Sequence, residues 1–183
     1  MGRYSNHSTS QETREKQKQE RLGEERLNNQ GCLMKIVEYH MANDIIVEFQ
    51  DEFKSRVQTR YSMFRQGEIR NPYQLNVSGG MTGNKYPVKV NGKTIKEYST
   101  WHNMLDKCAN NEKYTICKEW LFYENFYEWL HSQENFDKWY EGTRWNLCNT
   151  IVKGNKEYSP EMCYLIPYNL KQLLMKLDID TEN

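Results

Sequence analysis

The chain lacks the features that would place it in a membrane or in an oxidising compartment. Its 183 residues contain no run of 18 apolar side chains and no secretory signal, so we expect neither a transmembrane helix nor export. The five cysteines form no Cys-X-X-Cys pair and their number is odd, which argues against a disulfide framework. We therefore expect a protein of a reduced, cytosolic compartment whose thiols are free.

The chain also lacks a net charge. Lys plus Arg and Asp plus Glu number 25 each, so no overall field steers the protein toward DNA or a membrane surface. The mean hydropathy is low, at −0.98, but aromatic residues make up 13% of the chain, which excludes a wholly disordered protein. We expect a packed core that begins after residue 26.

Residues 1–26 have almost no aliphatic side chains. The run from Ser10 to Arg21 contains no apolar residue at all, so a helix formed there would have no face to bury. We predict a disordered arm, or a solvated helix that orders on a partner, and we expect its removal to leave the rest folded. Whether it docks on a partner or is a passive tail stays open.

Residues 27–73 have the pattern of a small β-module. Residues 32–39 and 45–49 are rich in β-branched side chains and flank a turn at Asn43-Asp44. Residues 53–61 alternate, with Phe53, Val57 and Tyr61 on one face. Three short strands with tight turns predict an SH3-like module.

The other face of that third predicted strand is basic. It presents Lys54, Arg56 and Arg60, and Arg65 and Arg70 follow soon after. Cations spaced about 7 Å apart along a strand can each meet a phosphate, so these five residues are our first candidates for nucleic-acid or acidic-partner contact. The alternative is an ordinary solvated sheet face.

Residues 74–96 have the composition of a linker. Gly79 to Gly83 lacks the Lys-Ser/Thr ending of a phosphate-binding P-loop, so we do not interpret it as one. Asn91-Gly92 predicts a tight hairpin turn near its end. We expect this stretch to separate two modules.

From residue 97 the apolar spacing is helical. Two or three helices are predicted before residue 140, and His102 and His131 lie on or beside them as weak candidates for a chemical role. A zinc site built from Cys108, Cys117 and Cys163 is one alternative, and small buried thiols in the core are the other.

Residues 145–177 predict two strands followed by a helix. The first strand covers residues 145–152, a turn follows at 153–156, and the second strand covers residues 163–166. Pro167 suits a helix start, and Leu170, Leu173, Leu174 and Leu177 line one helix face. The predicted fold class is therefore α+β: the β-module, then a domain over residues 97–183 in which helices precede a ββα unit.

This C-terminal part resembles the phage-encoded HNH, or His-Me finger, endonucleases. The likeness extends over residues 98–177, and residues 30–73 resemble an N-terminal part that some of these phage proteins carry. The matching segments are residues 101–108, 116–120, 123–126, 154–155, 158–163 and 169–170, together with 31–36 and 67–73. The resemblance implies a ββα metal-binding unit in a protein of the bacterial cytoplasm.

The chain departs from the family pattern at the positions that carry the catalytic chemistry. Cys148, Asn149, Thr150 and Met162 stand where the family places its metal ligands and general base, and none of them suits a hard Mg²⁺ ion or takes a proton from water. We therefore expect no catalytic residue and no metal or other cofactor. If the protein is an active nuclease instead, Mg²⁺ is its cofactor and Asn149, Asn155 and Glu161 are its candidate catalytic residues. The remaining oxygen donors are then Asn155, Glu161 and Asn169.

A nuclease-like unit without its ligands predicts binding without cutting. The expected partner is nucleic acid or a host nucleoprotein, such as a CRISPR effector of the Cas9 type that an anti-CRISPR protein would inhibit, and no membrane. Arg144, Lys153 and Lys156 surround the remnant of the site and complete the set of candidate binding residues. The alternatives are an active metal-dependent nuclease for DNA or guide RNA, and an accessory regulator without a defence role.

Overall fold

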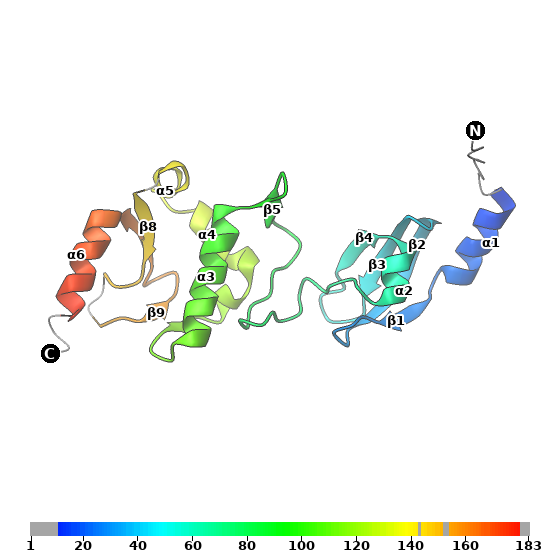
Figure 1. The fold of residues 1–183 in the computed structure, drawn as a ribbon, viewed down its shortest axis with the longest axis horizontal. Helices are drawn as coiled ribbons and strands as arrows, with labels where there is room; N and C mark the ends of the chain where they lie inside the picture. The colour runs from blue at the N-terminus through cyan, green and yellow to red at the C-terminus, as the bar shows by residue number, and fades with distance from the viewer. Residues whose placement is uncertain (1–10, 143, 152–153, 180–183) are drawn as a thin grey trace, which may run out of the picture. The chain divides into compact units, whose positions relative to one another are not determined.

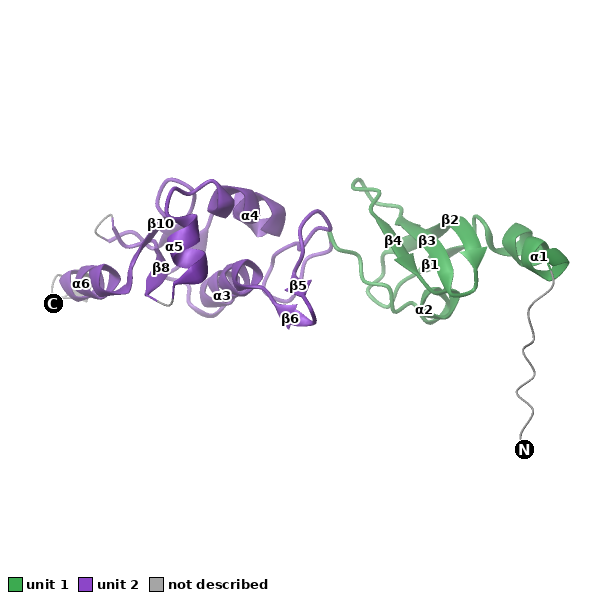
Figure 2. Cartoon of the chain, turned by 90° about the horizontal axis from the view of Figure 1, so that it is seen from above, with its two compact units in different colours: residues 1–73 green, residues 74–183 purple. Residues whose placement is uncertain are grey.

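The fold is known from a computed structural model, which describes residues 11–142, 144–151 and 154–179 (Figure 1). The chain divides into two compact units, Met1–Tyr73 (unit 1) and Gln74–Asn183 (unit 2), coloured separately in Figure 2. Helices and small, mainly antiparallel sheets occur in the described residues, so the predicted α+β class is confirmed.

Unit 1 is a four-stranded antiparallel sheet with a helix at each end of its sequence. Its elements are α1 (Gln11–Arg21), β1 (Glu25–Leu27), β2 (Leu33–Met41), β3 (Asp44–Phe49), β4 (Arg56–Thr59) and α2 (Tyr61–Gln66), and the strands pair in chain order. β2 and β3 bury alternate side chains, as the β-branched pattern predicts. Phe64 of α2 completes this core from outside the sheet.

The third predicted strand is wrong at both ends. β4 covers only Arg56–Thr59, because Asp51 Oδ1 accepts hydrogen bonds from the backbone N–H groups of Phe53 (3.1 Å) and Lys54 (3.0 Å) and holds them in a turn. Lys54 has a left-handed φ of 47°, which a strand residue does not adopt. Arg60 lies beyond the end of β4 and is the N-cap residue of α2. Lys54, Arg56 and Arg60 therefore belong to three different local structures.

The N-terminal segment is partly integrated into unit 1. The helix α1 has no buried side chain, in keeping with the predicted solvated helix. Its last residue, however, places its guanidinium 4.0 Å from the ring centroid of Tyr61 and donates a 2.6 Å hydrogen bond to the Tyr39 hydroxyl. Gly23 and Glu24 exchange backbone hydrogen bonds with Ile36. Residues 21–26 therefore make contacts with unit 1 that the sequence did not predict, so we expect the loss of these residues to destabilise it.

We expect two truncations to separate these parts. Removal of residues 1–20 should change the stability of unit 1 by about 0.5 kcal/mol or less, because α1 buries nothing. Removal of residues 1–26 should cost about 2 kcal/mol or more, because several backbone hydrogen bonds to β2 disappear and each contributes about 0.5–1.5 kcal/mol. Urea denaturation followed by far-UV circular dichroism measures both, and equal stabilities of the two truncated chains would contradict the assignment.

Unit 2 is a helical layer followed by short strands and a last helix. Its elements are β5 (Lys89–Val90), β6 (Lys93–Thr94), α3 (Lys96–Asn110), β7 (Thr115–Ile116), η1 (Glu119–Leu121), α4 (Tyr123–His131), α5 (Phe136–Glu141), β8 (Trp145–Cys148), β9 (Glu157–Tyr158), β10 (Tyr164–Pro167) and α6 (Tyr168–Ile179). Aromatic side chains dominate the core. Trp101 is fully buried there, and its indole N–H donates a 2.7 Å hydrogen bond to the Trp120 carbonyl.

The segment that we expected to be a linker is packed into unit 2. Met81 exchanges backbone hydrogen bonds with Leu121 (2.8 Å) and Tyr123 (2.9 Å). Gly80 lies so close to the core that a Cβ there would be 2.4 Å from Leu105 Cδ1, so only glycine fits without repacking. The linker prediction is therefore wrong for this part. The predicted hairpin is confirmed, since β5 and β6 pair around the left-handed residues Asn91 and Gly92.

The C-terminal strands and helix follow in the predicted order. β8 and β10 pair antiparallel, with Cys148 opposite Tyr164, and α6 begins directly after Pro167 (Figure 1). The first strand ends at Cys148 rather than at residue 152, and residues 152 and 153 lie outside the described residues. The leucine face of α6 is largely exposed: Leu173 and Leu177 each keep 55% of their surface accessible.

Candidate functional site

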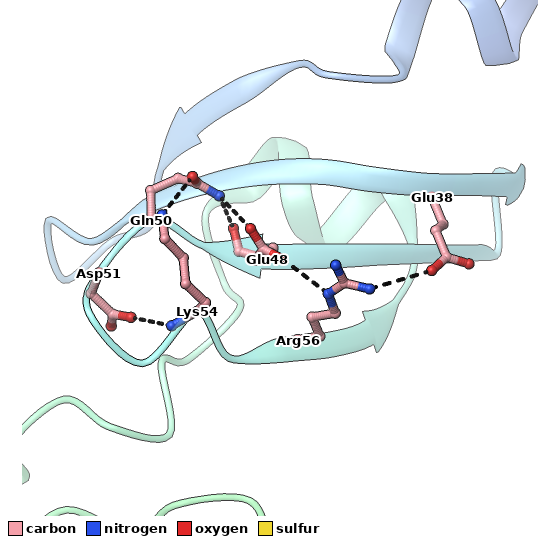
Figure 3. Close-up of polar contacts among 6 residues, drawn as sticks. All are labelled: Glu38, Glu48, Gln50, Asp51, Lys54 and Arg56. Carbon is pink, nitrogen blue, oxygen red and sulfur yellow. Dashed lines mark hydrogen bonds and ion pairs between the residues drawn. The ribbon is translucent and has the colours of Figure 1, made fainter.

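Two of the basic residues predicted in unit 1, Arg56 and Lys54, are engaged with neighbouring side chains. Arg56 of β4 lies opposite Glu48 of β3, and its Nε is 2.9 Å from a carboxylate oxygen of Glu48 (Figure 3). A second guanidinium nitrogen lies 3.7 Å from a carboxylate oxygen of Glu38. The hydrogen bond from Arg56 lowers the pKa of Glu48, so the carboxylate stays ionised. Lys54 donates to the Gln50 side chain at 3.1 Å. The charges here largely cancel, which makes this surface a poor phosphate-binding face.

The other cations predicted in unit 1 are spread over different segments. Arg65 lies in the last turn of α2 and Arg70 in the loop that follows. The Arg65 carbonyl accepts a hydrogen bond from the Arg26 side chain. Lys54, Arg56 and Arg60 therefore do not share the single strand face that the alternation predicted, and Arg65 and Arg70 lie on other segments.

A pocket of about 500 Å³ in unit 2 has a different character. Its described lining consists of lysines, side-chain amides and phenols, with one threonine and one methionine: Lys107, Lys113, Lys156, Lys171, Asn111, Asn146, Asn149, Gln172, Tyr114, Tyr158, Tyr168, Thr150 and Met175. Among the described residues, no carboxylate lines it. The pocket therefore offers ammonium, amide and hydroxyl donors, and its described lining contains no acidic side chain.

Two short strand pairs bring these side chains together. β7 and β9 pair in parallel, and the Thr115 N–H donates to the Lys156 carbonyl at 3.2 Å, so the loop with Lys113 and Tyr114 lies beside Lys156. The β8–β10 pair places the start of β8 beside the start of α6: Trp145 lies opposite Pro167, and the Tyr168 N–H donates to the Arg144 carbonyl at 2.7 Å. Along α6, Lys171 and Gln172 follow Tyr168 at helical spacing, so all three line the pocket.

Lys107 and Lys171 are the most firmly positioned cations of the pocket. The Lys107 ammonium lies 3.6 Å from the ring centroid of Tyr114 and donates to the Tyr158 hydroxyl at 3.2 Å. The Lys171 ammonium donates to the Leu147 carbonyl at 2.9 Å. Burial is the main cause that lowers the pKa of Lys171; the Cys148 thiol acts in the opposite direction, and the charge of Lys107 acts in the same direction as burial. Both side chains therefore bring positive charge to one pocket.

Of the residues predicted for an active nuclease, only Asn149 lines the pocket. It is 4% exposed, and its amide nitrogen has no hydrogen-bond partner among the described residues. Asn155 has a structural role instead: its amide donates to the Asn149 carbonyl at 2.6 Å and to the Glu157 carbonyl at 3.0 Å. Glu161 is exposed in a turn and does not line the pocket. The structure therefore does not assemble the three into one site.

The described thiols and histidines are not grouped as a metal site. No three His, Cys, Asp or Glu side chains in the described part of the chain are arranged to hold a metal ion, which overturns the zinc alternative. Burial raises the pKa of the Cys163 thiol to about 12, so it is not a thiolate at neutral pH. His102 and His131 each contact a carboxylate of the same unit, Asp106 at 2.9 Å and Glu97 at 3.4 Å.

The sequence identified only part of the pocket. Of the three cations proposed around the nuclease-like remnant, Lys156 lines the pocket, Arg144 is exposed and does not line it, and Lys153 lies outside the described residues. The sequence analysis missed Lys107, Lys113 and Lys171. A signal was present in α6, where the polar residues Lys171 and Gln172 fall on a different face from the leucines.

Comparison of the chain with protein-family models, with curated proteins and with solved structures finds no match. Within the described residues, no helix combines the length and the apolar character that crossing a bilayer requires. The functional argument therefore depends on the geometry and charge of the pocket.

Proposed function

We propose that unit 2 binds nucleic acid through its lysine-lined pocket and does not cleave it. The observation that carries the proposal is the lining itself: four of its described side chains are lysines and none is a carboxylate. Phosphate oxygens are the commonest partners of lysine in nucleic-acid complexes, and neutralising them releases counterions. Amide and phenol groups add hydrogen-bond donors for phosphate, sugar or base.

The same lining argues against metal-assisted hydrolysis. A divalent cation in this pocket would face several ammonium groups and no carboxylate among the described residues. The Cys148 thiol is buried and engaged with the Thr150 hydroxyl at 3.2 Å. Asn149 has no group that accepts a proton from water. Ammonium groups supply positive charge for a phosphate without the Lewis acidity that a metal contributes.

The proposal includes nucleic acid held by a protein. A CRISPR effector presents the phosphates of its guide RNA and target DNA, so such a nucleoprotein is within the class of partners that this pocket suits. The phage origin, the cytoplasmic location and the HNH-like ancestry inferred from the sequence belong to the same proposal. Affinity capture from a bacterium that carries a CRISPR system, with and without nuclease treatment of the lysate, tests this extension.

The proposed function predicts binding without products. Fluorescence anisotropy with labelled single-stranded DNA, duplex DNA and structured RNA should show salt-sensitive binding to at least one of them. The same samples, incubated with Mg²⁺ or Mn²⁺ and then resolved on denaturing gels, should be identical to samples in EDTA. Absence of binding to all three would contradict the proposal, and cleavage abolished by EDTA and by Asn149→Ala would favour the nuclease alternative.

A further inference from the structure

We infer that the pocket binds one nucleotide that carries a phosphate monoester, at the end of a nucleic-acid strand or free. The inference rests on the proposed function and names the ligand of the same site. In it, Lys107 and Lys171 hold the phosphate, and the base lies against the tyrosines of the wall.

The dimensions of the pocket favour a whole nucleotide. Its volume of about 500 Å³ falls within the range of about 300–1,000 Å³ typical of small-molecule pockets and far exceeds the space that a lone phosphate occupies. Its walls come from α3, the loop before β7, the end of β8, the start of β9, and α6. Walls from five segments suit a single nucleotide better than a continuous run of backbone, which needs an extended groove.

The charge of the pocket favours a monoester over a diester. A phosphate inside a strand carries one negative charge, whereas a terminal monoester carries about 1.5–2 at neutral pH. Lys107 and Lys171 line the same pocket, and no carboxylate among the described lining residues compensates for their charges. A ligand with close to two negative charges neutralises both ammonium groups.

The remaining donors match the rest of a nucleotide. Tyr168 is 52% exposed at the pocket, so its ring is accessible to a base, and base stacking on an aromatic side chain contributes without regard to sequence. Asn149, more than nine-tenths buried in the wall, has an amide nitrogen without a partner in the described structure. That nitrogen is itself shielded from solvent, so a ligand oxygen would reach and satisfy this costly buried donor only after the side chain turns toward the pocket.

The test compares strand ends on the full-length chain. One 12-nucleotide single strand is made with a 5′-phosphate, with a 3′-phosphate, or with hydroxyl groups at both ends, and adenosine 5′-monophosphate serves as competitor. We expect at least one phosphorylated strand to bind tenfold or more tightly than the hydroxyl form, and the mononucleotide to displace it. This preference should disappear in Lys107→Met/Lys171→Met and persist in Lys176→Met, an exposed lysine of the same helix that does not line the pocket.

The outcomes separate this inference from the proposed function. Equal affinity for phosphorylated and hydroxyl ends, with strong binding of both, would overturn the monoester inference and leave nucleic-acid binding intact. If no strand binds, the proposed function is overturned. If the mononucleotide also fails to bind, the inference about a nucleotide ligand is overturned too. Thermal unfolding measured by tryptophan fluorescence checks that each variant is folded, and Lys171→Arg, which keeps the charge, should retain the preference if Lys171→Met unfolds the unit.

Discussion

Exchange of both Lys107 and Lys171 for methionine is expected to weaken binding of a single-stranded oligonucleotide by about 100-fold or more at low salt. Each charge-assisted hydrogen bond contributes about 1.5–3 kcal/mol, and about 1.4 kcal/mol corresponds to a tenfold change. Methionine keeps the unbranched apolar stem of lysine, so α3 and α6 should pack as before. The slope of log Kd against log salt should also fall by close to one for each phosphate that the variant no longer neutralises.

The matched control for this double variant carries Lys93→Met and Lys176→Met. Both lysines are exposed in unit 2 and neither lines the pocket, so the net charge changes equally while the pocket stays intact. Anisotropy titrations at several salt concentrations give both the affinities and the slopes. An equal loss of affinity in the two double variants would indicate diffuse electrostatic attraction and would exclude the pocket as the binding site.

Replacement of Trp101 by alanine is expected to destabilise unit 2 by about 3–5 kcal/mol, which is a large share of the stability of an ordinary domain. The side chain is fully buried at the centre of the aromatic core. Its removal leaves a cavity and also takes the indole donor away from the Trp120 carbonyl. Trp101→Phe, which keeps much of the ring volume, should cost clearly less.

The distribution of tryptophan makes this experiment selective. All five tryptophans of the chain lie after residue 73, so tryptophan fluorescence reports unit 2 alone. In urea denaturation, the unfolding midpoint measured by tryptophan fluorescence should shift to a lower urea concentration in Trp101→Ala. The circular dichroism transition that comes from unit 1 should keep its wild-type midpoint. A shared loss of stability in both units would show that they do not unfold independently.

Local patterns predicted the regular elements well. The β-branched runs correspond to β2 and β3, Asn91-Gly92 forms the β5–β6 hairpin, and the C-terminal strands and helix occur in the expected order. The predicted bounds of the third strand were wrong because alternation of side chains alone does not detect a turn. Asp51 accepts two backbone hydrogen bonds and turns the chain before Arg56, so Lys54 leaves the strand.

The pocket was harder to predict because its cations are distant in sequence. Lys107 and Lys171 come from different helices, and only the β7–β9 and β8–β10 pairings place these helices around one cavity. Pairings of two to four residues leave almost no signal in a single sequence. The basic residues of unit 1 were clear in the sequence, but they are weaker candidates for binding in the structure. Glu48 and Glu38 engage Arg56, and the alternation did not reveal these pairs because neither residue is adjacent to Arg56 in the sequence.

Photo-crosslinking tests most directly whether the pocket holds nucleic acid. A single strand with 5-iodouracil as its terminal, phosphorylated nucleotide is irradiated in complex with the full chain in Mg²⁺, and the crosslinked peptides are identified by mass spectrometry. The proposed binding mode predicts crosslinks to Tyr114 or Tyr168 and recovery of the uncrosslinked strand at full length. Crosslinks confined to unit 1 around Arg56 and Arg60, or shortened strands in Mg²⁺ but not in EDTA, would contradict it.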